Sequence, residues 1–269
     1  MHARNTQTVK SSFVFSLLAS AVLMPCVAAA QATAPAPTTA PAAAAAPAAE
    51  SSPHTFSTNI GLVSDYRYRG ISQSRLAPAI SAGADYSHSS GFYVGAWASS
   101  IKWIRDGGGK GDLELDLFGG YKFELAKDFN VDVGFLAYVY PSNGLPVNAN
   151  TQEFYVAATY GPVTAKYSIS TSNLFGFADS KRSGYFDVTG TFDLGNGWGA
   201  IGHAGHQSVR NNAGFGYTDY KLGVTKDIDG WVLGASLIGT DNKNYRYVSA
   251  TKDKNLGKTG LVLSVAKTF

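Results

Sequence analysis

Charged side chains recur at every second position in several stretches of the sequence, each time interleaved with apolar residues. In residues 112–117, Asp112, Glu114 and Asp116 alternate with leucines. Alternation with this period places the carboxylates on one face of a strand and the leucines on the other. Carboxylates that face a water-filled interior favour the passage of cations. The pattern therefore suggests a pore lining rather than a reaction centre.

The same alternation along the chain gives a set of ionisable residues that face away from the apolar side of their strands. We interpret them as candidates for a pore lining: Asp65, Arg67, Arg69, Asp85, Asp112, Glu114, Asp116, Lys122, Asp132, Glu153, Lys166, Asp187, Asp219 and Lys221. Because acids outnumber bases in this set, the sequence predicts a weak preference for cations.

The arginines of this set, Arg67 and Arg69, fall near one end of a strand, and Asp112 and Glu114 fall near the same end of another. Two interpretations stay open. In one, the opposed charges set up a transverse field at the mouth of a pore. In the other, acid–base pairs bridge neighbouring strands and plug a narrow barrel.

His206 and Ser208 offer the only arrangement that resembles nucleophilic catalysis. They share one face of a strand, as in outer-membrane phospholipase A, but the Asn that orients the base in that family is missing: the corresponding region offers Asp219 and Tyr220. A hydrolase is therefore the least favoured alternative. His203 and His206 point to opposite faces, which does not suit a metal site. We predict no catalytic residue, no metal and no cofactor, and a protein that is not an enzyme.

The first 55 residues differ from the rest. Residues 1–30 contain Arg4 and Lys10, then an apolar run and three alanines, which predicts a secretory signal peptide cleaved near Ala30. Residues 31–55 are mostly Ala, Pro, Thr and Ser, a composition typical of a disordered linker. The signal peptide holds two of the 22 Lys and Arg residues and none of the 19 acids, so the remainder is close to neutral. This balance does not support nucleic-acid binding.

Residues 56–269 follow the pattern of a transmembrane β-barrel, with strands of about ten residues and alternating faces. In the first strand, Phe56, Ile60, Leu62, Tyr66 and Tyr68 share one face, and we expect all five to face lipid. Tight turns alternate with six long polar connections: 70–75, 105–111, 141–150, 171–183, 210–216 and 240–258. This spacing predicts an all-β, antiparallel up-and-down barrel of about twelve strands with both termini in the periplasm.

Four stretches carry a resemblance to a known family: VSDYRYRGISQS at 63–74, YSHSSGFYVGAW at 86–97, YTDYKLGVTKD at 217–227 and GLVLSVAKTF at 260–269. They resemble the hallmark stretches of the TorF family of porin-like proteins of proteobacteria. The resemblance implies an outer-membrane barrel and a pore, and it brings no catalytic residues. The last stretch also resembles the closing strand of outer-membrane barrels, in which the barrel insertion machinery reads a terminal aromatic, here Phe269.

The sequence therefore predicts a Gram-negative outer-membrane channel for passive diffusion of small hydrophilic solutes or ions. The alternative is a non-conducting barrel that acts as a structural or surface-interaction platform. The expected partners are outer-membrane lipid, lipopolysaccharide, the insertion machinery and the permeating solutes. The basic residues of the last long loop would suit anionic lipopolysaccharide: Lys243, Arg246, Lys252, Lys254 and Lys258.

Overall fold

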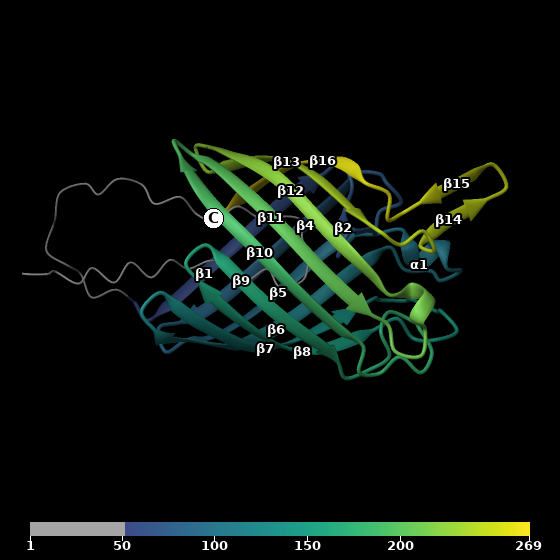
Figure 1. Ribbon diagram of the computed structural model, residues 1–269, viewed down its shortest axis with the longest axis horizontal. Helices are drawn as coiled ribbons and strands as arrows, with labels where there is room; N and C mark the ends of the chain where they lie inside the picture. The colour runs from purple at the N-terminus through teal and green to yellow at the C-terminus, as the bar shows by residue number, and fades with distance from the viewer. Residues whose placement is uncertain (1–51) are drawn as a thin grey trace, which may run out of the picture.

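The computed structural model describes residues 52–269 (Figure 1). The expected signal peptide (1–30) and most of the expected linker (31–55) lie outside these residues. The described chain forms a closed antiparallel barrel of twelve strands, which confirms the predicted fold class. The wall strands are β1 (His54–Val63), β4 (Ala79–His88), β5 (Phe92–Ser100), β6 (Leu113–Ala126), β7 (Phe129–Val139), β8 (Thr151–Tyr160), β9 (Val163–Ser170), β10 (Gly184–Gly195), β11 (Trp198–Ser208), β12 (Tyr217–Ile228), β13 (Trp231–Thr240) and β16 (Gly260–Thr268).

Each wall strand pairs with its neighbours in chain order, and β16 pairs with β1 to close the barrel. At this seam Leu62 lies opposite Val265 and Asn59 lies opposite Thr268. Both chain ends of the barrel, the start of β1 and the end of β16, lie at the end that carries the tight turns. We call this the turn end and the opposite one the loop end (Figure 1).

The two faces of the barrel wall differ in polarity. Large apolar side chains on the outer surface stay exposed, among them Ile80 at 66%, Leu222 at 67% and Leu261 at 62%. Residues of the opposite parity point inward, and many of these are both buried and charged, such as Glu114 and Asp219. A soluble barrel has the reverse arrangement, with an apolar interior, whereas apolar outside and polar inside is typical of membrane barrels.

Smaller elements gather at the loop end. They are the short helix α1 (Trp103–Asp106), the 3-10 turn η1 (Ala213–Phe215) and the hairpin of β14 (Arg246–Ser249) with β15 (Lys252–Asn255), which projects away from the barrel in Figure 1. Among residues 52–269, no helix has the length and hydropathy needed to cross a membrane.

The first wall strand is shorter than the alternation of residues 56–69 predicts. Phe56, Ile60 and Leu62 are exposed on the outer surface as expected, but β1 then ends and the chain enters the barrel. Tyr66 and Tyr68 are buried there, so the prediction that they face lipid is wrong. The sequence keeps its alternation through Tyr68 although the chain bends at Ser64 and Asp65 and leaves the wall, so the period alone does not show where a wall strand ends.

Candidate functional site

Residues 64–78, which we call the inserted segment, connect β1 to β4 and fold into the lumen. Every residue from 65 to 74 is buried. Two short strands, β2 (Arg67–Tyr68) and β3 (Ile71–Ser72), pair within it as a small hairpin. The turn between them is formed by Arg69 at φ 44° and Gly70 at φ 78°. Two consecutive residues with positive φ are typical of the tightest hairpin turns, and glycine adopts this conformation most easily.

Arg69 anchors the inserted segment to the wall. Its guanidinium donates to both carboxylate oxygens of Glu153, at 3.1 and 2.7 Å, and to Oε1 of Gln207 at 2.6 Å. It also lies over the ring of Tyr185, 4.0 Å from the centroid. Arg69 and Glu153 are both buried, so both charges have lost contact with water. The two parallel hydrogen bonds of a bidentate pair give the geometry that is needed to offset this desolvation cost. The contact therefore fixes the position of the hairpin in the lumen.

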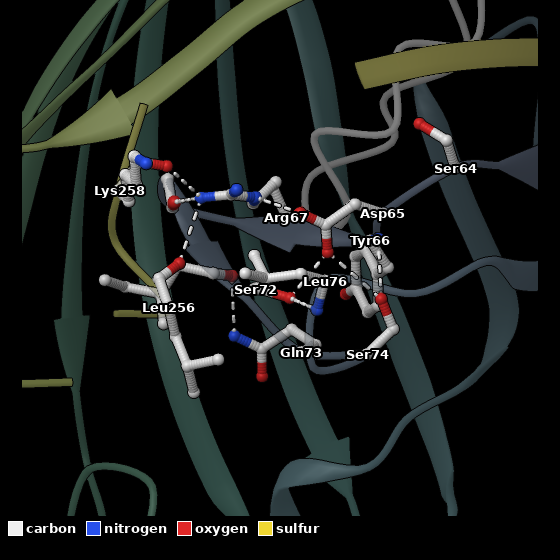
Figure 2. Close-up of polar contacts among 12 residues, drawn as sticks. Ser64, Asp65, Tyr66, Arg67, Ser72, Gln73, Ser74, Leu76, Leu256 and Lys258 are labelled. Atoms are coloured by element: carbon white, nitrogen blue, oxygen red, sulfur yellow. Dashed lines mark hydrogen bonds and ion pairs between the residues drawn. The ribbon is translucent and has the colours of Figure 1, made fainter. Parts of the chain in front are cut away.

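Arg67 anchors the same segment to the loop that joins β13 to β16 (Figure 2). Its Nη1 donates to the backbone oxygens of Leu256 at 2.9 Å and Lys258 at 3.1 Å, and to that of Gly70 at 3.0 Å. Its Nε pairs with Asp65, so the charge is balanced within the segment. The two arginines thus connect the inserted segment to two separate parts of the barrel.

Two tyrosines of the segment contact the wall between these anchors. The Tyr66 hydroxyl donates to Oε1 of Glu114 at 2.5 Å, and its ring meets that of Trp97 edge-on at 5.5 Å. Tyr68 shares a hydrogen bond of 2.7 Å with Tyr138. These contacts place acids and aromatic rings of the wall directly against the segment.

Asp116, on the same inward face of β6 as Glu114, is fully buried. Neither of its carboxylate oxygens has a hydrogen-bond partner among residues 52–269. Burying such a group costs free energy, and a wall selected for stability alone would replace it with an apolar residue. The acidic face of β6 is therefore more consistent with function than with scaffolding.

The lumen toward the turn end is more open to water. Asp85, Lys122 and Lys166 are partly exposed there, in contrast to the inserted segment. The Tyr93 hydroxyl donates to Oδ1 of Asp132 at 2.7 Å, and the Lys122 ammonium lies 4.9 Å from the centroid of the Tyr93 ring. Acids and bases thus mix along this half of the interior.

A second buried group of polar side chains lies on β10, β11 and β12. His203 Nε2 lies 2.9 Å from Oδ1 of Asp219, and the Tyr185 hydroxyl donates to Oδ2 of Asp219 at 2.9 Å. Asp187 lies 3.8 Å from His203 Nδ1, and Lys221 is buried on β12. Within the described chain, no three His, Cys, Asp or Glu residues are arranged to hold a metal ion.

Most of the ionisable residues that the sequence singles out lie on inward positions of wall strands or in the inserted segment. Asp112 does not join them: it lies just before β6 and pairs with Arg105 of α1, with both side chains about half exposed. The opposed charges envisaged at the mouth therefore do not meet. Arg67 pairs with Asp65 inside the inserted segment and Arg69 pairs with Glu153 on β8, so neither pair bridges two neighbouring wall strands.

Several residues of the site have no signal in the sequence beyond their inward parity. Gln207, Tyr138 and Tyr185 contact the inserted segment, yet nothing in their local sequence distinguishes them.

His206 and Ser208 form no catalytic pair. His206 Nδ1 lies 3.1 Å from the Thr218 hydroxyl, and the Ser208 hydroxyl donates to a backbone oxygen of β10.

Two solved porin structures have a similar fold. The KdgM porin is similar over 79% of this chain and 99% of its own, with a TM-score of 0.51 and 7% identity. The NanC porin is similar over 80% of this chain and 99% of its own, with a TM-score of 0.50 and 10% identity. At such identities the similarity concerns the fold alone. None of the curated proteins compared with the sequence matches it.

The sequence itself matches one family along the whole of the described barrel. Residues 47–269 match the family described as "Bacterial protein of unknown function (Gcw_chp)". The match includes the inserted segment, all twelve wall strands and the loop that holds Arg67. The chain therefore belongs to the Gcw_chp family of bacterial proteins.

Proposed function

We propose that this protein is an outer-membrane channel for the passive diffusion of small hydrophilic solutes or ions. The observation that carries the proposal is the closed twelve-stranded wall, apolar outside and lined inside with ionisable residues. An exposed apolar band requires lipid around it, and inward charges require water or paired charges. We expect the turn end to face the periplasm and the loop end to face the cell exterior, as in outer-membrane barrels with short periplasmic turns and longer external loops.

We further propose a weak preference for cations. Arg67 and Arg69 are neutralised by Asp65 and Glu153, so neither contributes a free positive charge. Glu114 and Asp116, beside the inserted segment, form no ion pair with a basic side chain among residues 52–269. A lumen in which acids remain in excess attracts cations.

The test is single-channel conductance of the refolded protein in a planar bilayer, with a salt gradient across it. We expect stable current steps and a reversal potential on the cation-selective side. An anion-selective reversal potential would contradict the proposed cation preference but would still support the channel function. Silence from protein verified as folded and inserted would contradict the channel itself.

The second candidate is a non-conducting barrel that binds partners at the cell surface. It is favoured by one observation: the ten consecutive buried residues 65–74 occupy the lumen near the loop end. In that case the basic loop around the β14–β15 hairpin would bind lipopolysaccharide, because Lys243, Lys252 and Lys258 are exposed. A silent barrel that binds lipopolysaccharide vesicles in low salt and releases them in high salt would support this candidate.

Three further expectations belong to the channel proposal. The resemblance to the TorF family points to the same class of protein. The protein is not expected to be an enzyme, which an assay of phospholipid hydrolysis checks.

Recognition of Phe269 by the barrel insertion machinery predicts that Phe269→Ala lowers the amount of assembled barrel in cells, while leaving refolding of the purified protein unchanged.

A further inference from the structure

The inserted segment crosses the interior instead of lining one side of it. It leaves the wall at β1, and in the order of the twelve wall strands the strand opposite β1 is β9. Arg69 reaches Glu153 on β8 and stacks on Tyr185 on β10, the two strands that flank β9. Tyr66 contacts Glu114 on β6, and Arg67 contacts the loop next to β16. One short segment thus touches the wall on several sides.

We propose that residues 65–74 form the constriction that determines what crosses the barrel, and that the Arg69–Glu153 pair fixes its position. The proposal rests on the channel function proposed above. Arg69 is a positioning residue in it, because its contacts are to the wall. Any solute that crosses must pass between this segment and the inward side chains of the wall.

Position and selectivity are linked at this pair. While Arg69 is paired with Glu153, its charge is compensated and contributes little to the field in the lumen. If Glu153 loses its charge, Arg69 becomes an uncompensated cation in the narrowest part of the lumen, and the segment loses its strongest anchor. We then expect the inserted segment to become more mobile and the ion selectivity of the channel to shift toward anions in the same variant.

The first test is Glu153→Gln, which keeps the size of the side chain and removes its charge. We expect a larger unitary conductance than in the wild type and a reversal potential shifted toward anions. The matched control is Asp253→Asn, which breaks the exposed Arg246–Asp253 pair of the β14–β15 hairpin and should change neither quantity. Conductance and selectivity of Glu153→Gln that equal those of the wild type would overturn the proposal.

The second test reads the position of the segment without any current. Residues 52–269 contain no cysteine, so Ile71→Cys introduces a single thiol at a side chain that is 6% exposed. We expect a water-soluble maleimide to label it at least about tenfold faster when Glu153→Gln is also present, because local opening becomes more frequent. Asp253→Asn should leave the labelling rate unchanged.

The two tests separate the two proposals. Equal labelling rates with and without Glu153→Gln would show that the pair does not anchor the segment. If the wild type and Glu153→Gln are both silent in bilayers, the channel function and the constriction fail together, whereas the labelling rates still decide whether Arg69 positions the segment. Heat-dependent migration on gels verifies that each variant is a folded barrel.

Discussion

The Tyr66 side chain shows how single residues hold the inserted segment. It is buried, its hydroxyl donates to Glu114, and its ring packs edge-on against Trp97. A carboxylate taken out of water needs donors to replace those it has lost. The hydroxyl therefore contributes to stability mainly through the charge of its partner, and the ring contributes through packing.

Tyr66→Phe separates these two contributions. The ring stays and the hydrogen bond to Glu114 is lost, so we expect the free energy of unfolding to fall by about 1.5–3 kcal/mol, the range for hydrogen bonds to charged groups. Urea unfolding of the barrel in detergent micelles, followed by tryptophan fluorescence, measures it. Tyr160→Phe, at an exposed site at the turn end of β8, is the control and should cost almost nothing. Equal stabilities of the two variants would contradict this role of Tyr66.

At the residue scale, the sequence predicts which face a side chain takes but not its partner. Glu114, Glu153 and Asp219 lie inward, as their parity indicates. That Arg69 pairs with Glu153, 84 residues away, does not follow from parity, because the period of a strand fixes a face and not a position around or along the barrel. Asp112 has the parity of Glu114 but lies outside the strand.

At the scale of elements, the wall strands combine an outward apolar face with an inward polar one. β12 shows this clearly, with Tyr220, Leu222 and Val224 exposed on one side and Asp219 and Lys221 buried on the other. This alternation is strong enough in the sequence to predict the number of wall strands and the order of long loops and tight turns. It does not predict where β1 ends, because the segment that follows keeps the same period inside the lumen.

Leu222→Arg tests whether the outer face contacts hydrocarbon. The position is exposed near the middle of β12, so a soluble barrel would tolerate arginine there, whereas in a bilayer we expect a loss of about 2–4 kcal/mol. Unfolding in urea from lipid vesicles measures it. Phe56→Arg, near the turn end of β1, is the matched control, since close to the interface the cost of the charge falls to about 0–1 kcal/mol. Equal effects at both depths would argue against a membrane-spanning wall.

At the scale of the whole molecule, charge is distributed unevenly along the lumen. Near the loop end, ion pairs neutralise all three arginines of the inserted segment, Arg67, Arg69 and Arg75. Toward the turn end, acids and bases remain partly exposed to water. The selectivity of the channel should therefore respond to single charges in this half without disturbing the inserted segment.

Asp85→Asn and Lys122→Gln form an opposed pair in this region, because each removes one charge from a partly exposed inward side chain. We expect Asp85→Asn to move the reversal potential toward anions and Lys122→Gln to move it toward cations. Both should leave labelling of Ile71→Cys unchanged. Shifts in the same direction, or no shift in either variant, would show that this half of the lumen does not select ions.

The anchor made by Arg67 also has a consequence for the order of assembly. Its acceptors Leu256 and Lys258 lie 189 and 191 residues further along the chain, one of the longest sequence separations that a hydrogen bond in this barrel spans. Contacts between such distant residues form late, because the loop they close costs the most entropy. The anchor is complete only after the last loop has reached its place beside β16. The β1–β16 seam joins residues that are at least as distant in the sequence, such as Asn59 and Thr268, so we expect the Arg67 anchor and the closure of the wall to form in the same late stage of assembly.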